Sequence, residues 1–146
     1  TIKQFMKKSI PLFLFVLLVL FTISCRKNNT PSLILNEMPD STAMTQTTGM
    51  FNNGPYGNVS GTAKVLLTGT KYELKLMDFS SSNGPDLRVY LSREMFPVNF
   101  IDLGALRATG GNQVYDIPGM PDLSKYKYAL VHCRQYNHLF GWALLQ

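Results

Sequence analysis

Cysteine and histidine are scarce in this sequence, whose 146 residues include only Cys25, Cys133, His132 and His138. A c-type haem would need a C-x-x-C-H motif, which is absent. A type-1 copper site combines two histidines with a cysteine and usually an axial methionine. No methionine follows His138 and no histidine precedes His132, so this pattern is not met. The sequence therefore predicts no metal site.

Clustered positive charge is also lacking. The whole chain has 14 basic and nine acidic residues, but Lys3, Lys7 and Lys8 lie in the first 25 residues. Without those three, the rest of the chain keeps 11 basic residues against nine acidic ones, a net charge of only +2. No basic cluster is interleaved with aromatic residues, so nucleic acid is not an expected partner.

Long amphipathic helices are absent as well. From about Gly49 onward, short β-prone runs alternate with turn clusters. Strands are predicted over 58–67, 71–79, 87–92, 99–106, 113–117, 128–133 and 139–145. Seven to eight short strands at this spacing predict an all-β domain, either a single antiparallel β-sandwich or a partly open barrel.

The N-terminal segment has the character of a signal peptide. Three lysines precede an uncharged run of 14 residues from Ile10 to Ile23. As a helix this run would span roughly 21 Å, short of the about 30 Å of a bilayer core. We therefore interpret residues 1–24 as a signal peptide rather than a stable span, with an uncleaved anchor as the alternative.

The run ends in "FTISC", which resembles the lipobox of bacterial lipoproteins. In such proteins the cysteine becomes the first mature residue and is acylated, which makes Cys25 the candidate lipidation site. Thr22 departs from the usual pattern, where a leucine is common. More than one acyl chain would anchor the protein stably on a membrane. A buried or disulfide-bonded Cys25 is the alternative.

The domain boundaries follow from these features. Residues 25–48 are expected to hold the lipidated cysteine and a polar tether, with an edge strand at Ser32–Leu35 as the alternative. Residues 49–146 are expected to form the β-domain. A lipidated Cys25 could not pair with Cys133, which would leave one thiol in an extracytoplasmic compartment.

Cys133 ends a predicted strand and precedes the polar stretch "RQYNH". Adjacent strand residues point to opposite faces, so His132 and Cys133 should not act on one ligand. His138 lies across the turn and could return toward the sulfur. We expect a half-exposed thiol at the rim of the sheet, near Arg134, which would favour the reactive thiolate. A buried, inert thiol is the alternative.

The stretch "SSSNGPD" predicts a tight turn before the strand at 87–92. Gly84, Pro85 and Asp86 are its structural residues. Gly84 is expected to adopt a positive φ, and Asp86 is expected to hydrogen-bond nearby backbone.

Four segments together resemble the DM-thirteen domain, a small extracellular family named for electron transfer and often found beside DOMON domains. They are "VSGTAKVLL", "DFSSSNGPDLRVYLS", "DLGALRATGGNQVYDIP" and "YALVHCRQYNHLFGWALL". The resemblance runs from about Gly49 to Leu145. It implies a β-rich fold and a redox role for Cys133, either as a bare thiol or as a ligand to a group such as haem. Family members commonly carry a bulky apolar or aromatic residue where this chain has His132.

These observations predict a membrane-tethered lipoprotein of the bacterial cell envelope, on the extracytoplasmic side. Its expected function is electron transfer through Cys133, with the membrane and an envelope redox or binding partner as its contacts. Haem is possible as a cofactor, although no attachment motif supports it. The alternative is a non-catalytic binding or adhesion module in which Cys133 is a buried structural residue.

Overall fold

The structure is a computed structural model that describes residues 34–146. The predicted signal peptide and Cys25 lie outside the described residues. Nine strands make up the fold: β1 Ile34–Asn36, β2 Met44–Asn53, β3 Val59–Thr68, β4 Lys71–Ser81, β5 Leu87–Ser92, β6 Phe100–Ala105, β7 Gly110–Ile117, β8 Tyr128–Cys133 and β9 His138–Leu144. Across residues 34–146, no helix has the length and apolar character needed to cross a membrane.

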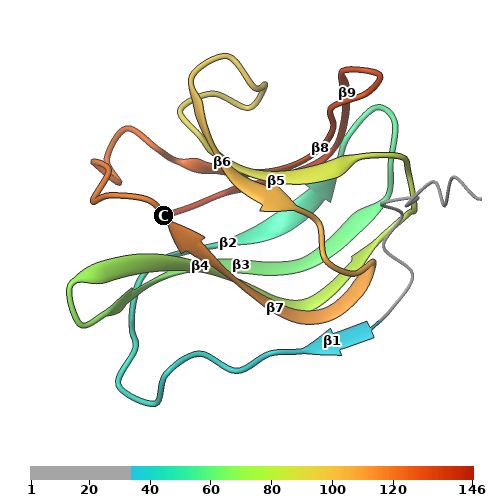
Figure 1. Cartoon of the computed structure of the whole chain (residues 1–146). Helices are drawn as coiled ribbons and strands as arrows, with labels where there is room; N and C mark the ends of the chain where they lie inside the picture. The colour runs from blue at the N-terminus through green and yellow to red at the C-terminus, as the bar shows by residue number, and fades with distance from the viewer. Residues whose placement is uncertain (1–33) are drawn as a thin grey trace, which may run out of the picture.

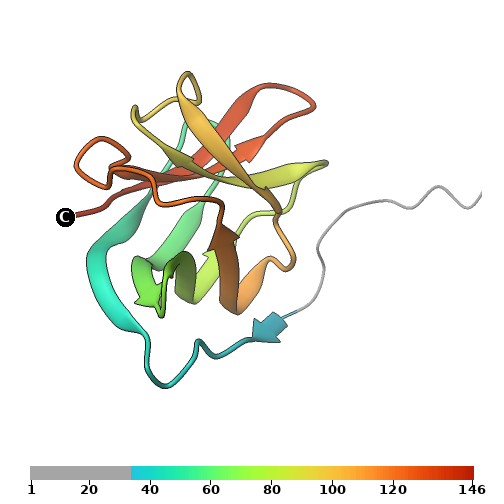
Figure 2. The same cartoon turned by 60° about the vertical axis from the view of Figure 1, so that its left-hand side comes forward.

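All nine strands belong to one sheet, in the order β1-β7-β4-β3-β2-β9-β8-β5-β6. The β1–β7 pair is parallel, and every other neighbouring pair is antiparallel. The sheet curls on itself, so that the half containing β3, β4 and β7 faces the half containing β5, β8 and β9 (Figure 1; Figure 2). The all-β prediction is confirmed, but the sheet is mixed and forms a half-barrel.

Strand β2 joins the two halves because its two ends have different partners. Residues Met44–Met50 pair with β3, whereas Phe51–Asn53 pair with β9. Shifts in strand register add curvature, since a β-bulge bends and twists the strand that carries it. One such shift lies in β3, where Gly61 adopts a φ of +108°.

The main core fills the inside of the curled sheet. Along β5, Leu87, Val89 and Leu91 all enter this core, as their alternation predicts. A smaller apolar cluster covers the outer face of β5, β8 and β9, around Tyr90 and Leu130. Strand β8 therefore has apolar neighbours on both of its faces.

The segment expected to be a tether, residues 25–48, contains β1 and the first part of β2. Strand β1 runs beside β7 at the sheet edge, close to the edge strand considered as the alternative. Glu37 fixes this connection, because its carboxylate accepts hydrogen bonds from Val114 N at 2.8 Å and from Arg107 Nη1 at 2.8 and 2.9 Å. The sheet thus begins well before Gly49.

Candidate functional site

The candidate site lies where β8 ends beside the start of β5. The pairing of Leu87 with Cys133 brings the sulfur beneath the loop Ser82–Asp86, which links β4 to β5. The Cys133 Sγ donates a hydrogen bond to the carbonyl oxygen of Pro85 at 2.9 Å. Pro85 therefore contributes its backbone oxygen to the site.

Cys133 is buried, with an exposed fraction of 1 %, and belongs to the main core. The expectation of a half-exposed thiol at the rim is therefore wrong. The loop that covers the sulfur comes from 48 residues earlier in the chain, so the polar stretch after Cys133 gave a misleading signal of exposure. The thiol is the donor in the hydrogen bond to Pro85, because a carbonyl oxygen can only accept.

Asp86 and Arg134 form what we call the clasp, which holds the covering loop against the end of β8. Arg134 N donates to the Asp86 carbonyl at 3.1 Å, and Arg134 Nε donates to Asp86 Oδ2 at 2.7 Å. Both bonds lie within one residue of the Pro85–Cys133 contact. The carboxylate of Asp86 thus bonds an arginine side chain, and the expectation that it bonds nearby backbone is wrong.

The left-handed backbone of the turn is at Asp86, with a φ of +52°, and not at Gly84. The expectation of a positive φ at Gly84 is therefore wrong. Aspartate is among the residues that tolerate this conformation. Gly84 is required for a different reason, because a Cβ there would lie 2.8 Å from Cζ of Phe140. The glycine lets the loop pack directly on a core aromatic ring.

His132 lies on the face of β8 opposite to Cys133, as predicted. Its ring packs on Tyr90 of the outer cluster, with 5.5 Å between ring centroids, and its exposed fraction is 4 %. Nε2 lies 3.1 Å from Asn137 Oδ1, whereas Nδ1 is buried without a hydrogen-bond partner. Burial lowers the pKa of His132; the bond to Asn137 opposes this shift and the nearby His138 adds to it. The imidazole is therefore held neutral.

His138 pairs with Cys133 in the strand register, but its ring stacks on Tyr56 with 3.7 Å between centroids. The thiol is directed to Pro85 instead. The two groups are thus neighbours in backbone only. The described part of the chain holds no group of three or more side chains suited to a metal ion.

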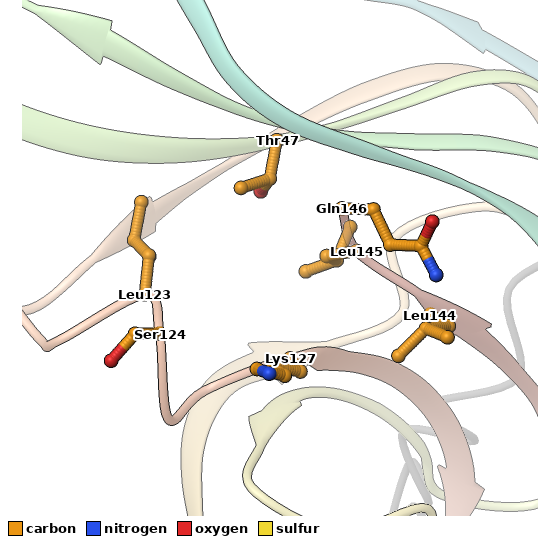
Figure 3. Close-up of a pocket in the computed structure, with 7 residues that line it drawn as sticks. All are labelled: Thr47, Leu123, Ser124, Lys127, Leu144, Leu145 and Gln146. Carbon is orange, nitrogen blue, oxygen red and sulfur yellow. The ribbon is translucent and has the colours of Figure 1, made fainter.

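The surroundings of Cys133 do not fit a haem. An axial sulfur ligand needs an open face beside it, and here the sulfur is enclosed by the core and by the carbonyl of Pro85. A hollow of about 510 Å³ is lined by residues of β2, the loop before β8 and the end of β9, and not by Cys133 (Figure 3).

Comparison with protein families gives one match that covers most of the chain. The model for the electron-transfer domain DM13 matches residues 50–145. The chain belongs to the DM13 electron-transfer family. No curated protein and no solved structure gives a significant match. The family match confirms the resemblance carried by the four sequence segments, and it contains both the covering loop and Cys133.

Proposed function

We propose that this DM13 domain is tethered to the extracytoplasmic face of a bacterial membrane by lipid on Cys25, and that it transfers electrons through Cys133. The family supports an electron-transfer role. Cys133 is the free cysteine of the described domain. The observation that carries the proposal is the position of this thiol under a loop held by a clasp at the surface.

The clasp is exposed enough for the end of the loop at Pro85 and Asp86 to open while Gly84 stays packed on Phe140. The exposed fractions of the Arg134 and Asp86 side chains are 60 % and 25 %. Ion pairs at such positions contribute at most about 1 kcal/mol. The left-handed φ of Asp86 also costs some free energy in the closed loop. A loop held in this way can move aside and admit a reaction partner to the sulfur.

The chemistry that a bare thiol supports is exchange with a disulfide of an envelope partner. With the loop open, Cys133 loses its proton and the thiolate attacks one sulfur of the partner disulfide. A mixed disulfide forms, the partner's S–S bond breaks, and the second partner sulfur leaves as a thiol after taking up a proton. A second partner that carries two thiols then completes the transfer. One of its thiolates attacks the Cys133 sulfur and releases the first partner as a dithiol, and its other thiolate attacks the sulfur now bonded to Cys133. The second partner leaves as a disulfide and Cys133 takes up a proton, so that two electrons have passed from the second partner to the first.

Burial of Cys133 favours a second candidate function, a binding module of the cell envelope in which the cysteine only fills the core. Free cysteine commonly behaves as a small apolar residue. In that case the sulfur would be inert while the fold is intact.

The experiment that tests the proposal measures mixed-disulfide formation at Cys133 with glutathione disulfide, followed by mass spectrometry on the folded chain. We expect slow modification in the unaltered protein and a rate about three- to fivefold higher in Arg134→Gln, because the clasp then loses its ion pair. Arg88→Gln is the matched control, since Arg88 pairs with Asp102 at the same 2.7 Å distance but lies on β5.

Equal rates in both arginine variants would show that the clasp does not control access to the sulfur. Modification that occurs only after denaturation would remove Cys133 from electron transfer. The binding-module function would then be the better account of this domain.

A further inference from the structure

A second candidate site lies at the other end of β8 from Cys133. The hollow of about 510 Å³ is lined by Thr47, Leu123, Ser124, Lys127, Leu144, Leu145 and Gln146. Figure 3 shows Thr47 projecting from β2 into the space between Leu123 and Leu145, with Lys127 on the side facing Thr47. This volume lies within the range of about 300–1,000 Å³ typical of small-molecule sites.

The walls of the hollow are largely aliphatic. Leu123 comes from the loop before β8, whereas Leu144 and Leu145 come from the end of β9 and the residue after it. The backbone fixes these walls, because Leu145 N donates to the carbonyl of Lys127 at 2.8 Å and Gln146 exchanges two hydrogen bonds with Thr48. The apolar surface is therefore held open rather than collapsed.

Thr47 contributes a polar side chain to the wall of this apolar space. The register of β2 against β3 shifts between Thr45 and Thr47. The Thr47 Oγ1 atom is buried and has no hydrogen-bond partner in the described domain. Buried hydroxyls are nearly always paired, so the Thr47 side chain gains a hydrogen bond if it rotates about χ1 and turns its hydroxyl toward a ligand in the hollow.

Lys127 supplies positive charge at the same hollow. Its neighbour Lys125 forms an ion pair with Asp122 at 3.3 Å, whereas Lys127 forms no ion pair within residues 34–146. The site thus combines an aliphatic cavity, a buried hydroxyl and an uncompensated ammonium group. This combination is complementary to a molecule with an aliphatic chain and a negatively charged head.

We propose that the hollow is a binding site for monomeric amphipathic carboxylates, with the aliphatic chain against Leu123, Leu144 and Leu145. The carboxylate lies between Lys127 and Thr47, and one of its oxygens accepts a hydrogen bond from the Thr47 hydroxyl after this side chain rotates about χ1 into the hollow. The site is independent of Cys133, because the strand β8 separates the two. Failure of the electron-transfer proposal would therefore leave this one standing.

The test is a titration of the isotope-labelled chain from Arg26 onward with decanoate, followed by NMR. Every residue of the main core lies between Phe51 and Leu145, and the dispersion of the spectrum verifies that the chain is folded. We expect saturable shifts confined to the residues around Leu123 and Leu145. Decanol, which has the same chain without the charge, is expected to bind several-fold more weakly.

Matched variants separate this site from nonspecific binding. Lys127→Gln is expected to weaken decanoate binding about three- to fivefold, since the ammonium group is exposed, whereas Lys125→Gln leaves it unchanged. Thr47→Val is expected to weaken it by up to about tenfold through loss of one hydrogen bond, whereas Thr45→Val has no effect. Shifts spread over the whole domain, or equal affinities for decanoate and decanol in all variants, would overturn the proposal.

Discussion

The turn before β5 shows that one glycine can be required for packing rather than for its backbone conformation. The motif "NGPD" suggests a left-handed glycine, yet the left-handed residue is Asp86, two positions later. Gly84 is the point at which the loop rests on the ring of Phe140. A sequence motif can predict such a turn, but it does not distinguish a glycine needed for close packing from one needed for a positive φ.

Because Gly84 is required for packing, Gly84→Ala is predicted to destabilise the fold. The new Cβ would lie 2.8 Å from Phe140 Cζ and 3.2 Å from Leu87 Cδ2, closer than side chains tolerate. We expect the free energy of unfolding to fall by about 1–3 kcal/mol, as for other overpacked cores. Chemical denaturation monitored by circular dichroism measures the loss.

The same substitution in a Phe140→Leu background distinguishes packing from backbone strain. A smaller side chain at position 140 makes room for the Cβ, so Gly84→Ala should cost much less there than in the unaltered protein. An equal cost in both backgrounds would contradict the packing explanation.

His132 carries a second prediction at the scale of one residue, a dependence of stability on pH. Burial lowers its pKa from the ordinary value of 6.5. The unfolded chain therefore takes up a proton near pH 6.5, while the folded chain takes it up only at lower pH. Stability is fully present above about pH 6.5 and is lost as the pH falls through the folded pKa.

The variant His132→Phe isolates this effect. Phenylalanine retains an aromatic contact with Tyr90 and removes the unpartnered Nδ1, so we expect about 1 kcal/mol more stability at pH 7. Melting temperatures between pH 8 and pH 5 should fall less steeply in the variant than in the unaltered protein. Parallel curves for the two proteins would show that His132 does not titrate differently on folding.

At the scale of elements, strands with two buried faces or clear alternation were predictable from the sequence. Strands β5 and β8 have the predicted bounds, 87–92 and 128–133, because apolar side chains recur on the inner face of each. Strand β7 begins three residues earlier than predicted, since its start is the Gly110-Gly111 pair that reads as a turn.

Strands β1 and β2 were not predicted as part of the domain, because their residues do not form a recognisable apolar face. Most residues of β2 are exposed, including Met44 and Met50, so its sequence lacks an alternating apolar face. Both strands are held by backbone hydrogen bonds and, near β1, by the Glu37 carboxylate. Backbone hydrogen bonds can form with almost any side chain, so they cannot be predicted from the residue types of a strand.

At the candidate site, features set by neighbouring residues were predicted, whereas features set by residues far away in the sequence were not. The opposite faces of His132 and Cys133 follow from strand geometry and were predicted. The burial of Cys133 and the clasp depend on a loop that lies 48 positions away. Only the folded chain reveals that contact.

At the scale of the whole molecule, the fold separates two regions of different chemistry along one strand. Cys133 and the clasp lie at one end of β8, and the hollow beside Lys127 lies just before its other end. The core and the loop before β5 enclose the sulfur, whereas the hollow lies between the loop before β8 and the end of β9 (Figure 3). A carrier of electrons and a binder of small amphiphiles could thus share one domain without sharing residues.

The proposed membrane tether gives the last prediction, which concerns the whole chain in a bacterial host. Eight residues separate Cys25 from Ile34, the first residue of β1, so the two residues lie at most about 32 Å apart in a fully extended chain. Lipid on Cys25 would therefore keep the domain close to the membrane surface. We expect Cys25→Ala to abolish incorporation of a labelled fatty acid, whereas Cys133→Ala retains it. The melting temperature should be unchanged in Cys25→Ala, because all residues of the main core lie within 51–145. Persistent labelling of Cys25→Ala would exclude this residue as the lipid attachment site and leave the tether without support.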